Sequence, residues 1–201
     1  MYFLLRDSIM PRPVGWVSSI DLSGNTNLAP FSFFTVASPN PPVLGFSCGP
    51  RGEDRSGAAI VLKDTLANIR ATKEFVINIS PEKWLEEMVR SSDPLPSGAS
   101  EFAHIGLSPA ASTSVKPPRV AGTPVAYECA LHSIVEIGQS AWVMGTVQHV
   151  HIDEAVYRGD LRVDLLKDPG TRPIGRLGRA FYSRIRNEEI VKRMDGGQAG
   201  T

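Results

Sequence analysis

The sequence predicts a mainly β protein, an antiparallel barrel that carries two or three inserted helices. Short runs with alternating apolar and polar residues dominate the first half of the chain, and turn signals separate them. Two long strand-like runs follow in the second half, joined by a tight glycine-containing turn at 138–140. Strands and helices do not alternate regularly, which argues against a doubly wound parallel sheet.

The first strand is predicted at 14–20, where alternation places Val14, Trp16 and Ser18 on one face. A Ser-Gly-Asn turn signature follows and predicts a hairpin.

The stretch 27–47 combines phenylalanines, which are typical of a core, with prolines and hydroxyl residues, which are not. It is expected to begin as a strand and to break at 38–42, because proline cannot donate to a β-ladder. From residue 43 it is expected to resume as a short buried strand.

Two helices are predicted further along the chain. Residues 63–75 carry Asp64 or Thr65 as a candidate N-cap, and an alternating strand follows at 75–80. The second helix is predicted at 80–92.

This second helix has the clearer start signal. Ser80 suits the N-cap and Pro81 suits the first helical position. Its apolar face is formed by Trp84, Leu85, Met88 and Val89. The long stretch 93–118 is expected to hold only one short helix, around 101–106.

Length and charge narrow the class of protein. The 201 residues are expected to form one domain over 1–190, followed by a disordered tail at 191–201. Lys plus Arg and Asp plus Glu each number 21, so the formal net charge is zero. No closely spaced basic run appears, which argues against nucleic acid or a membrane surface as the partner.

Cysteine and histidine usage points away from disulfides and metals. Cys48 and Cys129 lie in apolar runs and are expected to be free buried thiols in a reducing compartment. His149 and His151 share a strand face, but no third or fourth ligand stands out, so no metal site is expected. The N-terminal apolar run is too short for a signal peptide or a membrane span, so a cytoplasmic location is expected.

Several motifs, in this order and spacing, carry a family resemblance. They read MPRPVGWVSSID, GNTNLAPFSFFTVASPNPPVLGFSCG and KDTLANIRATKEFVINI. Over 2–79, and more weakly through 141–153 and 173–183, the chain resembles the flavin reductase-like family. This is the FMN-binding split β-barrel group related to flavoprotein oxygenases and to the reductase components of two-component monooxygenases.

The resemblance implies an FMN-binding split β-barrel that forms a homodimer. It implies FMN as cofactor, with FAD as an alternative, and NAD(P)H as the electron donor. It also allows a monooxygenase as partner.

The FMN phosphate calls for backbone amides, hydroxyls and a cation, and Lys63 and Thr65 offer these at a helix start. In the family this segment lies at the phosphate. Asp64 is expected to cap the helix or to orient Lys63, and Asn68 to brace the loop. The alternative is an ordinary capped helix with a solvated lysine.

The isoalloxazine ring calls for exposed backbone groups and small hydroxyls. Pro30 interrupts the ladder, so that neighbouring amides are free to face a ligand, and Ser32 offers a hydroxyl. Cys48 has no sequence neighbour that would lower its pKa as a redox thiol. The candidate residues at the ring, some from their place in the family pattern, are Asn27, Ala29, Pro30, Phe31, Ser32, Ser47 and Cys48.

Three phenylalanines in this stretch cannot all point the same way. Phe31 and Phe33 would share one face of an alternating strand, and Phe34 would take the other. One face is expected to pack the barrel and the other to meet flavin or the partner subunit. The alternative places all three in the core or the dimer interface.

Several arginines have two interpretations. Arg12, fixed between two prolines, reaches either the ligand or a carboxylate of its own fold. Arg51 or Arg55, in a longer loop than the family pattern, could replace or supplement Lys63. Arg176 and Arg179 either attract a nicotinamide phosphate or are solvated. Tyr182, nearby, either lies near the flavin pocket or packs in the fold.

Hydride transfer between nicotinamide and flavin needs no acid–base constellation, so no catalytic residue is assigned. The predicted function is an oxidoreductase that transfers hydride from NAD(P)H to flavin. The alternative is an FMN-binding electron carrier, similar to a flavoredoxin, that a protein partner reduces. A third hypothesis is a relative that has lost the flavin.

Overall fold

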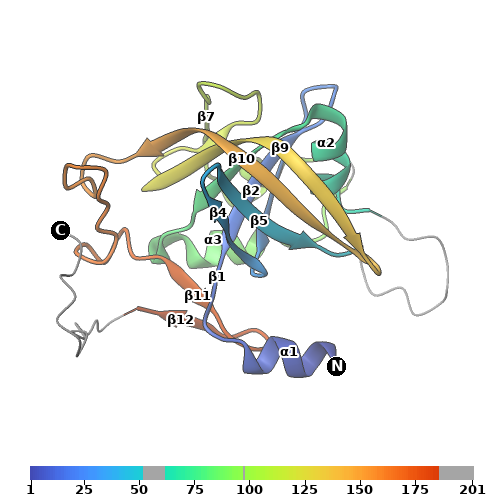
Figure 1. Cartoon of the computed structure of the whole chain (residues 1–201), viewed down its shortest axis with the longest axis horizontal. Coiled ribbons are helices and arrows are strands. Elements are labelled where there is room, and N and C mark those ends of the chain that lie inside the picture. Colours follow the sequence, from blue (N-terminus) through green and yellow to red (C-terminus); the bar gives the residue numbers. More distant parts are fainter. Residues whose placement is uncertain (52–61, 97, 186–201) are drawn as a thin grey trace.

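A seven-stranded antiparallel sheet forms the body of the molecule, with the strand order β3-β2-β6-β9-β10-β5-β4 (Figure 1). The computed structural model describes residues 1–51, 62–96 and 98–185. The strands of this sheet are β2 (Gly15–Ile20), β3 (Thr26–Phe31), β4 (Phe34–Pro39), β5 (Pro42–Cys48), β6 (Glu74–Ile79), β9 (Val125–Ile137) and β10 (Ser140–Ile152).

The helices that accompany this sheet are short. Helix α2 contacts strands β2 and β3, and α4 contacts β3. A separate two-stranded ladder, β7 with β8, lies between α4 and β9 in the sequence. The bounds are α2 (Asp64–Thr72), the 3-10 helix η1 (Glu82–Trp84), α3 (Leu85–Arg90), α4 (Glu101–Ile105), β7 (Pro109–Ala110) and β8 (Arg119–Val120).

A small outlying unit brings the N-terminal segment against residues near 180. Its three-stranded sheet has the order β1-β11-β12, and helix α1 lies beside it, at the edge of the molecule (Figure 1). The elements are α1 (Tyr2–Ser8), β1 (Arg12–Pro13), β11 (Ile174–Arg176) and β12 (Tyr182–Arg184). The sequence patterns did not predict α1.

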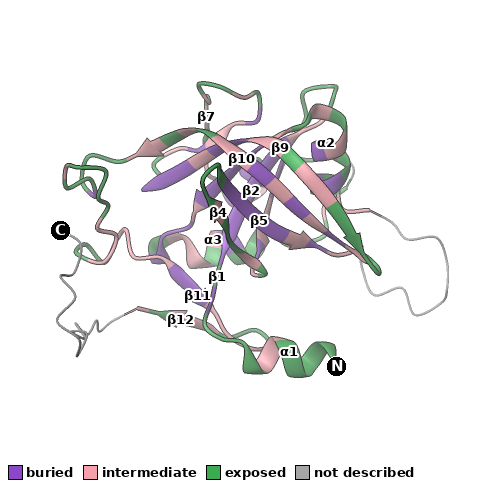
Figure 2. Ribbon diagram, in the orientation of Figure 1, coloured by how far each residue is buried: buried purple, intermediate pink, exposed green. Residues whose placement is uncertain are grey.

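Two hydrophobic clusters form the core, one on each side of strand β2. Val17 belongs to the cluster around Phe46, whereas Trp16 belongs to the cluster around Met88. Figure 2 shows the strands buried through the middle of the molecule and α1 exposed. The predicted strand at 14–20 is confirmed, and it is buried on both faces.

The stretch 27–47 breaks at a different place from the one predicted. Strand β3 ends at Phe31 and β4 begins at Phe34, so the interruption is at Ser32 and Phe33. The proline-rich 38–42 is a hairpin turn, in which Pro39 pairs with Pro42 across the end of the β4–β5 ladder.

This interruption changes the phase of the phenylalanines. Phe31 and Phe34 both pack into the cluster around Phe46, and Phe33 is 37% exposed. The expectation that Phe31 and Phe33 share a face is therefore wrong, because strand alternation does not continue across two non-strand residues.

The starts of the helices also differ from the predictions. The N-cap of α2 is Lys63, with Asp64 as the first helical residue, so neither Asp64 nor Thr65 is the cap. The segment after β6 begins as a 3-10 turn whose N-cap is Pro81, not Ser80. Val89 is exposed, whereas Met88 on the same helix is buried.

Other elements agree with the sequence patterns. The strand near 75–80, the short helix near 101–106 and the β9–β10 hairpin are confirmed. The expected tail at 191–201 lies outside the described residues. Within the part of the chain that the structure describes, no helix is long and apolar enough to cross a membrane.

Gly145 leaves no room for a side chain, and we expect Gly145→Ala to destabilise the fold. A Cβ built there would lie 2.3 Å from Phe75 and 2.8 Å from the Cβ of Cys129. Overpacking of this kind costs about 1–3 kcal/mol in the free energy of unfolding. Chemical denaturation would measure the loss.

The matched control is Gly49→Ala. At Gly49 the nearest atom to an added Cβ is the Ser140 hydroxyl oxygen, at 3.8 Å. The stability of this variant should stay within about 0.5 kcal/mol of wild type. Equal stability of the two variants would contradict the packing argument at Gly145.

Candidate functional site

A buried hydroxyl–amide network joins the start of α2 to strands β2 and β3. The Asn27 side-chain amide donates to Thr65 Oγ1 at 2.8 Å and more weakly to Ser19 Oγ at 3.4 Å. Asn68 also donates to Ser19 Oγ, at 3.2 Å. These contacts bring three predicted site residues together, and they fix the direction in which α2 begins.

Lys63 lies over the aromatic end of strand β3. Its Nζ is 5.4 Å from the centroid of the Phe31 ring, a cation–π distance. Leu66 and Ala67 donate their backbone N–H groups to the Lys63 carbonyl, which places Lys63 at the helix start. Because the first two amides of the helix, those of Asp64 and Thr65, have no intrahelical acceptor, this end combines a cation with backbone donors.

Arg51 also reaches the start of α2. Its guanidinium forms an ion pair with Asp64 at 3.1 Å, and both side chains are more than 40% exposed. Asp64 therefore pairs with Arg51 instead of capping the helix. Arg55 lies outside the described residues.

The outer edge of β3 is occupied differently from the prediction. The Leu28 N–H is directed away from β2 and donates to Glu101 Oε2 at 2.9 Å. Since hydrogen bonding alternates along an antiparallel strand, Pro30 faces the same way as Leu28, and the amides of Ala29 and Phe31 face β2. Pro30 thus removes a donor from this edge, and the expectation that it frees the neighbouring amides for a ligand is wrong.

The break after β3 is joined to the end of β5 by a backbone hydrogen bond. The Ser47 N–H donates to the Phe33 carbonyl at 2.8 Å, next to Ser32. Ser32 and Ser47 are half-buried. Ser47 therefore lies opposite Phe33, the residue that follows Ser32, and the closeness of the two serine side chains stays a prediction.

Arg12 holds the N-terminal segment in place. Its Nη1 donates to the carbonyls of Arg6, at 2.6 Å, and Ile9, and its Nη2 donates to the carbonyl of Leu177 at 2.9 Å. Its guanidinium lies 5.4 Å from the centroid of the Phe33 ring. Among the described residues, Arg12 therefore bonds backbone carbonyls and not a carboxylate.

The thiol of Cys48 is unsuited to redox chemistry. Burial raises its pKa to about 11, although Lys63 and Arg70 act in the opposite direction. Burial also raises the pKa of Cys129 to about 12. Both thiols are free and protonated near neutral pH.

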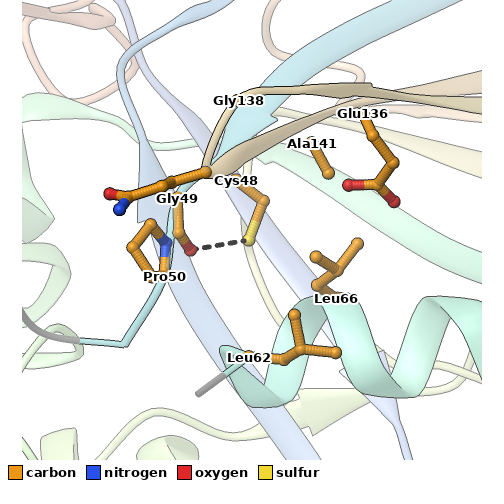
Figure 3. A pocket seen from close by; sticks show the side chains of 9 residues that line it. Cys48, Gly49, Pro50, Leu62, Leu66, Glu136, Gly138 and Ala141 are labelled. Atoms are coloured by element: carbon orange, nitrogen blue, oxygen red, sulfur yellow. Dashed lines mark hydrogen bonds between the residues drawn. The ribbon is translucent and has the colours of Figure 1, made fainter. Parts of the chain in front are cut away.

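A cavity of about 140 Å³ is lined by Cys48 (Figure 3). Leu62 and Leu66 of the α2 region line it together with Glu136 and Ala141 of the β9–β10 hairpin. Ligand pockets usually measure about 300–1,000 Å³, so this cavity is too small for a flavin ring. We place the candidate site at the β3–α2 junction instead.

The histidine pair has a structural partner. The rings of His149 and His151 are edge to face, with their centroids 4.7 Å apart, and His151 Nε2 bonds the buried Glu128 carboxylate. That carboxylate also accepts the N–H groups of Thr113 and Ser114. Among the described residues, no group of three or more His, Cys, Asp or Glu could hold a metal ion.

Side-chain contacts therefore bring five of the ten predicted site residues together near the two ends of β3, whereas Ala29 and Pro30 lie within the strand. One end holds Asn27 with Thr65 and Asn68, and the other holds Phe31 with Lys63. Sequence reasoning missed Ser19, whose hydroxyl is shared by the amides of Asn27 and Asn68. A serine in an apolar strand signals a buried polar partner, but it does not identify that partner.

Comparison with known proteins gives one consistent family. The model of the flavin reductase-like domain matches residues 6–166. An uncharacterised Aquifex aeolicus protein is 36% identical over 192 residues, which cover 96% of this chain and 93% of that protein.

Solved structures agree with the family match. Nitrilotriacetate monooxygenase component B from Bacillus cereus is 29% identical, with a TM-score of 0.84 and coverage of 94% of this chain and 92% of its own. A Shewanella frigidimarina structure with a split barrel domain is 22% identical, with a TM-score of 0.76 and coverage of 90% and 86%. The second likeness concerns the fold alone, and it confirms the expected split barrel. The sheet, the helix that follows β5 and the family match lead to one assignment: this chain belongs to the flavin reductase-like family.

Proposed function

We propose that the chain binds FMN and passes to it a hydride from NAD(P)H. The observation that carries the proposal is the position of Lys63, at the start of α2 and over Phe31 at the end of β3. The donor set fits a flavin mononucleotide, because a cation, a hydroxyl and helix amides suit a phosphate dianion. Bound FMN would supply the hydride acceptor.

The chain's own residues would bind the FMN and orient its ring. Lys63 and the α2 amides would hold the phosphate, and the Thr65 hydroxyl, which accepts from Asn27, can still donate. Ser32, in the break after β3, and Ser47, whose N–H bonds the adjacent Phe33 carbonyl, would bond the ring edge. Phe31 and Phe34 keep water from the core beneath.

A spectrum tests the proposal directly. Purified protein loaded with FMN should show flavin absorbance that bleaches when NADH or NADPH is added without oxygen. Consumption of NAD(P)H no faster than with free flavin would contradict hydride transfer. Tight flavin retention without NAD(P)H oxidation would instead identify an electron carrier that a protein partner reduces.

We also propose that the protein is a cytoplasmic homodimer that delivers reduced flavin to a monooxygenase. Helix α1 supports the dimer, because it buries none of its residues within this chain. Its apolar side chains and those just after it are 47–87% exposed, and faces of this kind mark protein interfaces. They are Met1, Tyr2, Phe3, Leu4, Leu5, Ile9 and Met10.

Charge insertion tests this face. Wild type should have twice the chain mass of 21.8 kDa in light scattering, and Leu4→Lys should shift it toward the single mass. Leu22→Lys is the matched control, since Leu22 is 82% exposed in a distant turn, and should leave the mass unchanged. A Leu4→Lys variant with unchanged mass would place the interface elsewhere.

A further inference from the structure

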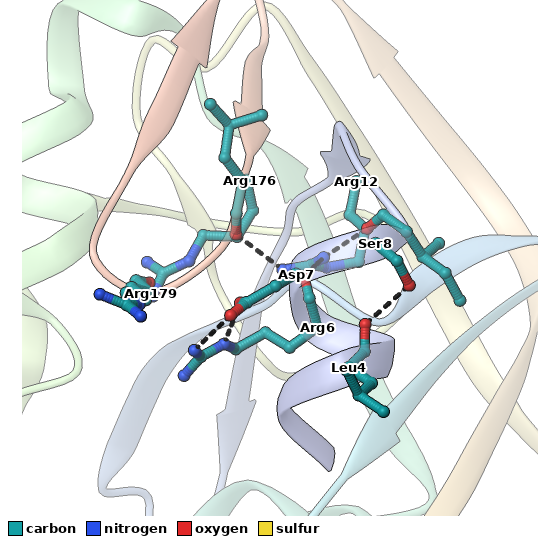
Figure 4. Close-up of polar contacts among 9 residues, drawn as sticks. Leu4, Arg6, Asp7, Ser8, Arg12, Arg176 and Arg179 are labelled. Carbon is teal, nitrogen blue, oxygen red and sulfur yellow. Dashed lines mark hydrogen bonds and ion pairs between the residues drawn. The ribbon is translucent and has the colours of Figure 1, made fainter. Parts of the chain in front are cut away.

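Four arginines gather around a single carboxylate where α1 meets the β11–β12 hairpin. Figure 4 shows Arg6, Arg12, Arg176 and Arg179 drawn around Asp7. Arg6 forms the ion pair with Asp7, with its Nε 2.6 Å from Oδ1. In a chain of zero net charge, this group alone carries an excess of three positive charges.

The guanidiniums of Arg12 and Arg176 are held by neutral oxygens. Arg12 bonds three backbone carbonyls, it is 5% exposed, and its Nε has no hydrogen-bond partner among the described residues. Arg176 lies 4.4 Å from the centroid of the Tyr182 ring and donates to the Tyr182 hydroxyl and to the carbonyl of Arg179. These contacts fix geometry without neutralising charge.

Electrostatics agree with an uncompensated cluster. Burial, and then the nearby charge of Arg176, lower the pKa of Arg12. The Arg6 hydrogen bond lowers the pKa of Asp7, with smaller effects from Arg179. Bringing several guanidiniums together costs free energy that a bound anion would recover.

Arg179 is the accessible member of the cluster. It is exposed, it has a left-handed backbone with φ of 53°, and its side chain makes no hydrogen bond within the described part of the chain. It lies in the turn between β11 and β12, so its guanidinium can adjust to a ligand that Arg176 meets in a fixed position.

The cluster adjoins the candidate flavin site. Arg12 pairs in register with Arg176, and its guanidinium lies over Phe33, whose carbonyl accepts the Ser47 N–H. A dinucleotide with its nicotinamide against a flavin near Ser32 would therefore have its phosphates within reach of these arginines.

We propose that this arginine cluster binds the phosphates of the nicotinamide dinucleotide and favours NADPH over NADH. The inference rests on the proposed function. Guanidinium groups match phosphate oxygens in geometry. The 2′-phosphate that distinguishes NADPH from NADH is a monoester, and it adds about −1.5 to −2 charges near neutral pH. This negative charge suits a cluster with three excess positive charges. Arg176 and Arg179 would bind the phosphates directly. The buried Arg12 would add positive charge without contacting them.

A redox-inactive fragment tests the site in the FMN-loaded protein. Adenosine 2′,5′-bisphosphate should bind in equilibrium dialysis, more weakly as salt is raised. Arg179→Gln should weaken it about tenfold, and Arg176→Gln with Arg179→Gln about 100-fold, because each charged hydrogen bond contributes roughly a factor of 10 or more. FMN affinity should change less than about twofold in both variants, by the independence of separate sites.

Matched variants separate charge from fold. Arg162→Gln removes an exposed arginine outside the cluster and should bind the fragment like wild type. Arg176→Lys keeps the charge but lacks the planar guanidinium. Its affinity for the fragment should therefore lie between the affinities of wild type and of Arg176→Gln. Binding equal to wild type in the double variant would overturn the site, and equal binding of adenosine 5′-monophosphate would overturn the preference for NADPH.

Failure of the phosphate site can be distinguished from failure of the proposed hydride transfer. Arginine-dependent fragment binding by a protein that oxidises no NAD(P)H would refute hydride transfer and support the phosphate site. Oxidation of NADPH with the same KM in wild type and double variant would support hydride transfer and overturn the phosphate site.

Discussion

Replacing Lys63 by glutamate is expected to weaken FMN binding about 100-fold, whereas riboflavin binding changes less than about threefold. A hydrogen bond to a charged group contributes roughly 1.5–3 kcal/mol, which is about 10- to 150-fold in a dissociation constant. Glutamate also places a negative charge at the helix start, where the amides favour the phosphate. Riboflavin lacks the phosphate, so it should not respond to that charge.

Quenching of flavin fluorescence measures both constants in one titration. Lys167→Glu makes the same charge change at an exposed position and should leave both affinities unchanged. Equal losses for FMN and riboflavin would mean that Lys63 supports the ring through Phe31 and that the phosphate lies elsewhere.

Arg51→Glu separates the two cations at the α2 start. Arg51 already has Asp64 as its partner at 3.1 Å, so its loss should weaken FMN less than the loss of Lys63. A larger effect at Arg51 than at Lys63 would assign the phosphate to the longer loop.

Local patterns predicted most of the sheet. The alternation at 75–80 and the glycine turn between β9 and β10 are properties of neighbouring residues, and both elements appear as expected. Asn27 and Thr65 are brought together by a contact between distant parts of the sequence. Local patterns cannot predict such a contact, and only the family resemblance, which assigns both segments to one site, suggested it.

The sequence predictions failed where the structure depends on tertiary contacts. Phe33 turned outward because two residues left the ladder, and no local signal marked Ser32 as the break. Arg12 bonds Leu177, a contact across 165 positions that composition cannot reveal. Helix α1 carries apolar residues on all sides, so it lacks the periodic stripe by which a surface helix is predicted.

Replacing Phe46 by alanine is expected to lower the free energy of unfolding by about 3–5 kcal/mol. Phe46 is fully buried, and its ring lies 4.7 Å from that of Phe31 and 5.7 Å from that of Phe75, measured between centroids. Strands from both halves of the sheet meet at this ring, so a cavity there cannot collapse easily. Thermal unfolding should show a melting temperature lower by roughly 10 °C.

Exposed Leu22 provides the control, since Leu22→Ala removes apolar atoms that contact solvent and should change stability by less than about 0.5 kcal/mol. The double-mutant cycle of Phe31→Ala with Phe46→Ala connects this packing to the site. Aromatic pairs contribute about 0.5–1.5 kcal/mol beyond their buried area, and a coupling of that size should remain. If the two losses in the free energy of unfolding were simply additive, Phe46 would stabilise the barrel without positioning Phe31. The Phe31 ring, over which Lys63 lies, would then be positioned by β3 alone.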